Sequence, residues 1–173
     1  MCNLEMFKID LKGMKTDEQS LEFDLDSDFF KSLEVSEVSG GTLHVSVSIR
    51  KAIGFYELHF HTVGTVIVPC DLCLDDMEQP IETDNVLVAK LGTETNTEDD
   101  VVTVDENEGM LDTSWLIYEF IALAIPIKHV HAPGKCNSAM TQKLQELSGA
   151  VRSGKEEAET MDPRWEKLKD LKV

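Results

Sequence analysis

Apolar and polar residues alternate over much of the first 61 residues. The alternating stretches are residues 7–11, 21–25, 42–49 and 56–61. A period of two is typical of β-strands that have one face in a core and the other in solvent. The last two stretches are separated by residues 50–54, which contain Gly54, so they predict a β-hairpin.

The pattern predicts more strands further along the chain. They cover residues 66–68, 81–91 and 101–104, the last as a short edge strand. Glycine and proline divide these strands from their surroundings. Gly40 and Gly41 predict a break before the first hairpin strand, Gly64 predicts a bulge or bend in the second, and Pro80 marks the start of the strand after it.

Residues 114–125 predict the main helix. They are apolar on every side except at Glu119, follow the potential capping residues Asp112 and Thr113, and precede Pro126. At about 1.5 Å per residue the helix is about 16 Å long, too short for a bilayer, so we expect it to be buried in a core. Two short helices complete the pattern, one capped by Asp26 or Ser27 and carrying Phe29, Phe30 and Leu33, and one over residues 140–148.

These elements predict an α+β fold. We expect a mostly antiparallel sheet, barrel-like or strongly curved, around one buried helix with short helices at the periphery. Residues 1–173 contain no convincing boundary, which predicts a single domain. Residues 149–173 begin with a small and charged stretch, and we expect this segment to be mobile.

The charge is strongly negative and unevenly placed. The chain has 33 acidic and 16 basic residues, a net charge of −17, and residues 141–173 contain seven of each kind, so the whole excess lies in the first 140 residues. Such a surface repels phosphate backbones, which argues against non-specific nucleic-acid binding. It keeps a protein soluble, and it could also attract a basic partner such as a ribosomal protein.

The first residues suggest a cytoplasmic location. They lack the basic start and apolar segment of a signal peptide, and no apolar run is long enough to span a membrane. We therefore expect reduced thiols. Four cysteines in a reducing compartment suggest metal binding more than a disulfide framework, with Cys2 standing apart.

Two distant segments offer zinc ligands. Cys70 and Cys73 are spaced Cys-x-x-Cys after a β-strand, and His131 and Cys136 follow the main helix in a turn that contains Pro and Gly. Two ligands on each of two knuckles is the pattern of a structural tetrahedral Zn²⁺ site. The 57 residues between Cys73 and His131 mean that only folding can bring the pairs together. His129 is an alternative fourth ligand.

Other interpretations of these residues stay open. The Cys-x-x-Cys pair could belong to a thiol redox protein, although Asp71, Asp75 and Asp76 are expected to raise the pKa of its thiols. His59 and His61 share a polar strand face, where a second metal site is one interpretation and solvated histidines are the favoured one. The hydrolase, phosphate-loop and zinc-protease motifs are absent from the sequence, and four protein ligands would leave no open metal position for catalysis.

Taken in order, these motifs resemble the YceD family, the large ribosomal RNA subunit accumulation proteins. The matching features are Cys70-x-x-Cys73-Leu74 after a hairpin, an acidic middle, a helix with Asp112 and Glu119 ending at Pro126, a loop with His131 and Cys136, and the ending Asp162-Pro163 with Leu168-x-x-Leu171. The resemblance covers most of residues 41–173. Many members carry a second Cys pair where this chain has His131 and Cys136.

The resemblance implies a non-enzymatic role in the synthesis, processing or stability of the large-subunit (23S) ribosomal RNA of bacteria. The expected partner is a ribosomal protein or an assembly intermediate of the large subunit. Arg164, Trp165 and the lysines that follow could contact RNA, but a C-terminal segment folding back on the body is the favoured interpretation.

Overall fold

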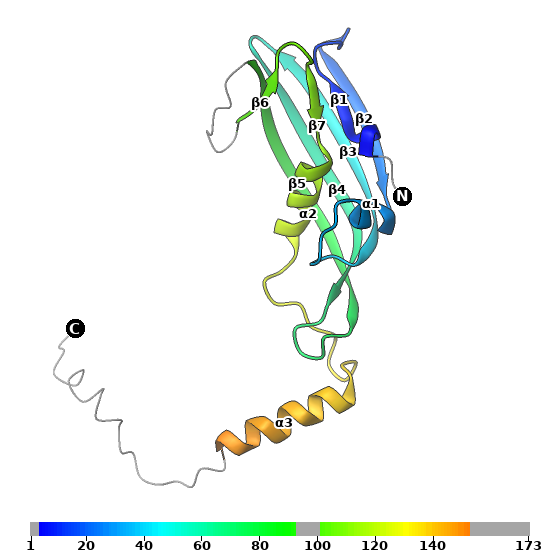
Figure 1. The fold of residues 1–173 in the computed structure, drawn as a ribbon, viewed down its shortest axis with the longest axis vertical. Coiled ribbons are helices and arrows are strands. Elements are labelled where there is room, and N and C mark those ends of the chain that lie inside the picture. The colour runs from blue at the N-terminus through cyan, green and yellow to red at the C-terminus, as the bar shows by residue number, and fades with distance from the viewer. Residues whose placement is uncertain (1–3, 93–100, 153–173) are drawn as a thin grey trace, which may run out of the picture.

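The computed structural model describes residues 4–92 and 101–152. In chain order the elements are a 3₁₀ turn η1 (Leu4–Phe7), β1 (Lys8–Asp10), β2 (Glu18–Leu25), α1 (Ser27–Ser32), β3 (Gly40–Ala52), β4 (Phe55–Pro69), β5 (Asp76–Gly92), β6 (Val101–Asp105), β7 (Met110–Asp112), α2 (Ser114–Ala124) and α3 (Ser138–Arg152). Figure 1 shows a tall sheet with α2 along one face and α3 beyond its lower end.

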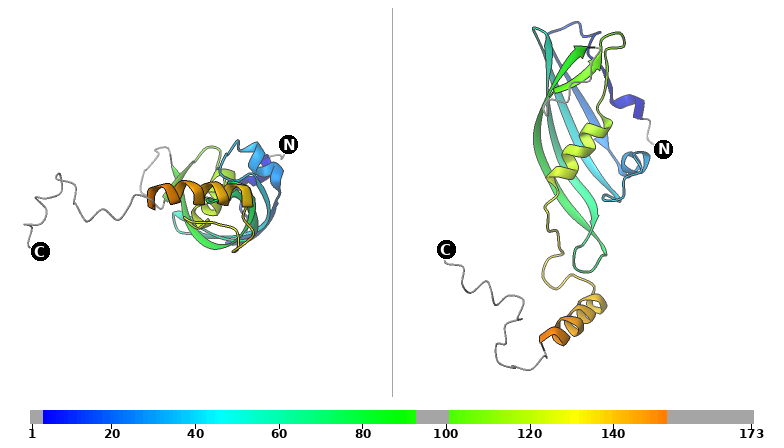
Figure 2. Two further views of the ribbon diagram at one scale, coloured as in Figure 1. Left: turned by 90° about the horizontal axis from the view of Figure 1, so that it is seen from below. Right: turned by 60° about the vertical axis from the view of Figure 1, so that its left-hand side comes forward.

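The main sheet has five strands in the order β2-β3-β4-β5-β6. All neighbours are antiparallel except β5 and β6, which are parallel. The sheet curves around α2 in the end-on view of Figure 2, but β2 and β6 are not hydrogen-bonded to each other. The predicted mostly antiparallel α+β architecture is therefore confirmed, and a closed barrel is not formed.

The short strand β7 was not expected from the sequence. It pairs with β1 in a second, two-stranded sheet, with Ile9 opposite Leu111. Both of these side chains are buried and belong to the main core. The small sheet therefore covers part of the core, next to the start of α2.

The strands β3 and β4 form the predicted hairpin. Their inward residues Leu43, Val45, Leu58 and Phe60 are at most 2% exposed, which follows from the alternation in the sequence. The turn is tighter than expected, because β3 continues to Ala52 and pairs it with Phe55. The helix α1 also begins as predicted, with the Asp26 carboxylate accepting hydrogen bonds from two backbone N–H groups of its first turn.

Glycine in β3 and β4 has a different role from the one predicted. The pairing register runs without a bulge through Leu43 opposite Gly64, and Gly41 lies inside β3, where a chain break was expected. A Cβ at Gly64 would lie 2.3 Å from the Thr42 carbonyl oxygen. Glycine here allows two backbones to approach closely, which the sequence pattern alone cannot distinguish from a bulge.

The strand β5 begins at Asp76 and includes Pro80, which had been predicted to precede it. The sheet tolerates this proline because β6 pairs only with Val88–Gly92, so among the described strands the Pro80 region pairs with β4 alone. A missing N–H is harmless on an edge that pairs with no other strand.

The helix α2 covers the concave face of the sheet. Ile117 and Ile121 are fully buried, and the Phe120 ring lies 5.3 Å from that of Phe60. Burial on every side, as predicted, is wrong: Trp115 is 55% and Leu123 is 76% exposed. The sheet contacts only one side of the helix, and the opposite side exposes Trp115 and Leu123 together with Glu119.

The last described helix, α3, extends beyond the predicted end at residue 148 to Arg152 and projects away from the sheet (Figures 1 and 2). Most of the segment expected to be mobile, residues 153–173, lies outside the described residues. None of the helices in the described part of the chain is long and apolar enough to cross a membrane.

Candidate metal centre

The first knuckle is the turn between β4 and β5. It is closed by two backbone hydrogen bonds, from Leu74 N to Cys70 O and from Cys70 N to Asp75 O, each 2.9 Å long. Leu74 has a left-handed φ of 62°, which reverses the chain directly after the second cysteine. The Leu72 N–H also points at the Cys70 sulfur at 3.5 Å. This geometry directs both thiols to the same side of the turn.

The second knuckle follows α2 and is tied to the first. The Asp71 N–H donates to the His129 carbonyl at 3.0 Å, and the His129 N–H donates to the Asp71 carboxylate at 2.8 Å. Beyond the turn at Gly134, the Asn137 side-chain amide donates to the Asp75 carboxylate at 3.2 Å. Both acidic residues of the first knuckle therefore hold the second one in place.

The two knuckles bring Cys70, Cys73, His131 and Cys136 together. One donor atom from each lies within 4.8 Å of the others. The Cys70 and Cys136 sulfurs are 3.9 Å apart, and His131 Nδ1 lies 3.4 Å from the Cys73 sulfur and 4.0 Å from the Cys136 sulfur. A tetrahedral Zn²⁺ with bonds of about 2.3 Å to sulfur and about 2.0 Å to nitrogen separates its ligands by about 3.5–3.8 Å. The donor set and its spacing therefore fit zinc.

The electrostatics of the cluster favour a cation. Burial opposes ionisation of Cys70, but backbone hydrogen bonds from Cys73, His131 and Leu72 outweigh it and lower the Cys70 pKa to about 6. Burial, followed by the hydrogen bond and charge of Cys70, raises the pKa of Cys136 to about 11. The first thiol is ready to act as a ligand, and the third resists ionising beside it unless a positive charge is present.

One expectation about this site was wrong. The acidic neighbours of the Cys pair were expected to raise the pKa of its thiols, but the Cys70 pKa is lowered. The reason is that backbone hydrogen bonds from Cys73, His131 and Leu72 lower it. The Asp71 and Asp75 carboxylates bind the His129 N–H and the Asn137 amide on the second knuckle.

His129 lies outside the group of four. Its Nδ1 is 3.0 Å from the Pro126 carbonyl oxygen and its Nε2 is 3.7 Å from the Asp71 carboxylate. Both ring nitrogens are therefore directed to protein oxygens. The geometry places His131, and not His129, among the thiols.

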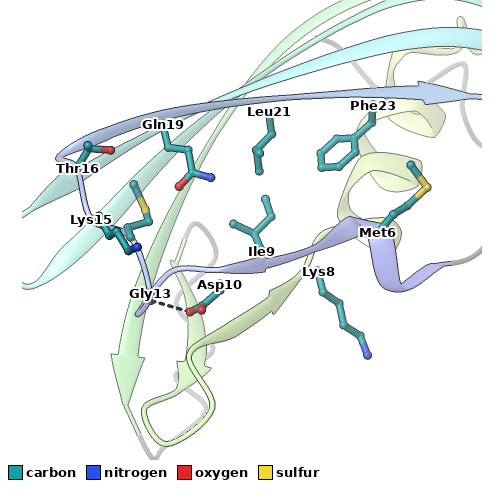
Figure 3. A pocket seen from close by; sticks show the side chains of 11 residues that line it. Met6, Lys8, Ile9, Asp10, Gly13, Lys15, Thr16, Gln19, Leu21 and Phe23 are labelled. Carbon is teal, nitrogen blue, oxygen red and sulfur yellow. Dashed lines mark hydrogen bonds between the residues drawn. The ribbon is translucent and has the colours of Figure 1, made fainter.

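Other possible sites in the described residues have fewer potential metal ligands close together. His59 and His61 lie half exposed on the convex face of the sheet, beside the carboxylates of Glu57 and Asp84. Among residues 4–92 and 101–152, only the Cys-His group brings three or more potential ligands together. The hollow in Figure 3, between β1 and β2, is lined by apolar side chains such as Ile9 and Leu21 and by polar ones such as Lys15 and Gln19.

A family model named "Large ribosomal RNA subunit accumulation protein YceD" matches residues 58–172. The chain belongs to the YceD family. The matched part contains most of β4, both knuckles and α2, so every residue of the candidate metal centre lies inside it. Searches of curated proteins and of solved structures found no match for this YceD protein.

Sequence reasoning named the four residues that the structure brings together, but it missed the hydrogen bonds that support them. Asp71, Asp75 and Asn137 connect the knuckles through hydrogen bonds. Asp and Asn beside a ligand turn are a weak signal, because the same residue types are common in any turn. Their role becomes visible only when the second knuckle is in place.

Proposed function

We propose that Cys70, Cys73, His131 and Cys136 bind one structural Zn²⁺. The support is the chemistry and spacing of the donors, with three sulfurs and one imidazole nitrogen within 4.8 Å of one another. Four protein ligands fill a tetrahedral site and leave no position for a substrate or an activated water. The ion would join the β4–β5 turn to the chain that leaves α2, which is a structural role.

With the two knuckles joined in this way, the protein supports the synthesis, processing or stability of large-subunit ribosomal RNA without catalysing a reaction. The observation that carries this proposal is the match to the family of large ribosomal RNA subunit accumulation proteins over residues 58–172. The net charge of −17 argues that the contact to the ribosome runs through a basic protein and not through bare RNA.

The test is a pull-down of the full chain from cells at low salt, with and without RNase, followed by sedimentation. We expect capture of large-subunit precursors, co-sedimentation with them and not with mature ribosomes, and binding that survives RNase. Protein that stays at the top of the gradient during assembly stress contradicts the ribosomal role. Binding that RNase abolishes and that weakens steeply with salt means direct RNA contact.

A thiol redox function is the second candidate, because the Cys70 pKa of about 6 favours a reactive thiolate and the Cys136 sulfur lies only 3.9 Å away. The low pKa is equally suited to a metal ligand, and Cys70 lies in a turn and not at the N-terminus of a helix. An insulin-reduction assay on metal-free protein separates the two. We expect no activity above that of a Cys70→Ser variant.

A further inference from the structure

A groove runs between α2 and the segment that follows α1. Its floor and walls are apolar, formed by Leu33, Val35, Tyr118, Ala122 and Leu123. In Figure 1 the segment after α1 lies beside α2, and the two line the groove together. Trp115 borders the groove and is 55% exposed, and Leu123 is 76% exposed, so the groove presents a large apolar surface to solvent.

The rim of this groove is acidic. Glu34, Glu37 and Glu119 line it, all are exposed, and no ion-pair partner is found for them within the described residues. Glu37 also acts on the buried Tyr118, whose pKa is raised by burial and then by the charge of this carboxylate. An apolar floor with three uncompensated carboxylates on its rim suits a segment that carries apolar and basic side chains together.

The chain contains a segment of that composition after α3. Residues 164–172 include Trp165, Leu168 and Leu171, spaced three residues apart. At 3.6 residues per turn these three share one face of a helix, with Arg164 and Lys172 close to them. The two acidic residues of the segment, Glu166 and Asp170, are four residues apart and fall on the opposite face of such a helix.

We propose that residues 164–172 bind as an amphipathic helix in the groove between α2 and residues 33–37 of the same chain. Trp165, Leu168 and Leu171 would cover the apolar floor, and the flanking basic side chains would meet the acidic rim. The mode is a helix in an apolar groove, with anchors at helical spacing. This proposal is independent of the zinc site and of the ribosomal role.

The length of the connection supports binding within one chain. Eleven residues, 153–163, separate the end of α3 from the segment and can span up to about 36 Å when extended. The helix α3 is about 22 Å long at about 1.5 Å per residue, so the connection is long enough to return along it toward the body. A tethered segment also binds at a high effective concentration, which a separate partner lacks.

Hydrogen–deuterium exchange of the full chain tests the proposal. We expect the amides of residues 165–172 to exchange at least about tenfold more slowly than the intrinsic rate for an unstructured peptide. The double variant Glu34→Lys and Glu37→Lys should remove this protection. The matched control Glu18→Lys and Glu22→Lys makes the same charge change on exposed positions of β2, away from the groove, and should leave it unchanged.

Charge reversal of the segment sharpens the test. Arg164→Glu with Lys172→Glu should also remove the protection, and combining it with the two groove substitutions should restore part of it. Exchange in β4 reports whether each variant is folded. Three results overturn the proposal: no protection in the wild-type chain, protection that the groove variants leave intact, or protection that rises with protein concentration, which would mean that a second copy provides the segment.

Discussion

The two ends of β4 are equally well buried but by different neighbours. Toward its start, Leu58 and Phe60 are at most 1% exposed and pack in the apolar core beneath α2. Just past its end, Cys70 and Cys73 are at most 2% exposed, and their sulfurs face His131 and Cys136. The first region is stabilised by the burial of hydrocarbon, which needs only the right pattern of apolar residues.

The second region depends on groups that repel one another when they ionise. Three thiols lie in one small space, and the raised pKa of Cys136 reflects burial and the nearby Cys70. Few apolar contacts are available there: Leu72 and Leu74 of the first knuckle are 44% and 69% exposed. From this comparison we expect the sheet to fold by burying its apolar residues without a metal ion, whereas the two knuckles need an ion to become rigid.

Removing one of the four proposed zinc ligands should have the largest effect, and it should be confined to the knuckle end of β4. In a Cys73→Ser variant we expect the zinc content to fall from about one ion per chain to near zero. Amide exchange should rise by about a thousandfold or more in residues 70–75 and 128–137, because the knuckles lose their common ligand. The core strands should keep their protection. A Leu72→Ser variant changes a neighbouring exposed residue and is the control.

Deleting a core ring is expected to give the next largest effect, in the opposite region. Phe60→Ala removes a ring that is 1% exposed and lies 5.3 Å from Phe120, so we expect a loss of about 3–5 kcal/mol in the free energy of unfolding. The folded variant should still bind zinc. Val63→Ala, at a 42% exposed position of the same strand, should cost less than about 0.5 kcal/mol in urea unfolding.

A smaller effect is expected at the start of α2. The Asp112 carboxylate accepts hydrogen bonds from the Ser114 N–H at 3.0 Å and from its hydroxyl at 2.6 Å. Asp112→Ala should lower the free energy of unfolding by about 1 kcal/mol, because the first turn of the helix loses an acceptor. Asp112→Asn keeps an acceptor oxygen and should retain most of the stability. Equal losses in the two variants would assign the effect to charge and not to capping.

The smallest effect concerns the solvated face of the sheet. A hydrogen bond to Asp24, 2.8 Å long, raises the pKa of His44 above its ordinary 6.5. A raised folded-state pKa contributes stability that is complete below pH 6.5 and is lost as the pH rises through the folded value. Asp24→Asn should therefore lower the His44 pKa in an NMR titration and leave zinc binding unchanged. An unaltered pKa would mean that the pair does not form in solution.

The difference between the regions also explains what could be predicted from the sequence. Alternation identified the inward residues of β3 and β4 because the sheet buries one face of each strand. The exposed side of α2 was missed, since an apolar helix pattern does not reveal which neighbour is absent. The register through Gly64 and the extra pair formed by β7 depend on contacts with distant segments, which local patterns do not contain.

As with the fold, the local features of the candidate site could be predicted from the sequence and the contacts between distant segments could not. Cys-x-x-Cys and the later His and Cys identify donors by their chemistry, and the structure brings all four together. The choice between His129 and His131 could not be made from spacing. It depends on the positions of the Pro126 carbonyl and the Asp71 carboxylate, which lie next to the two ring nitrogens of His129.

Metal analysis of the full chain, purified under reducing conditions without chelators, tests the central claim most directly. Elemental analysis gives the stoichiometry, and X-ray absorption at the zinc edge gives the donor atoms. We predict one Zn²⁺ per chain with three sulfur ligands and one nitrogen ligand, and loss of the nitrogen ligand in His131→Ala but not in His129→Ala. Zinc far below one ion per chain, or a nitrogen ligand that disappears only with His129, would contradict the account.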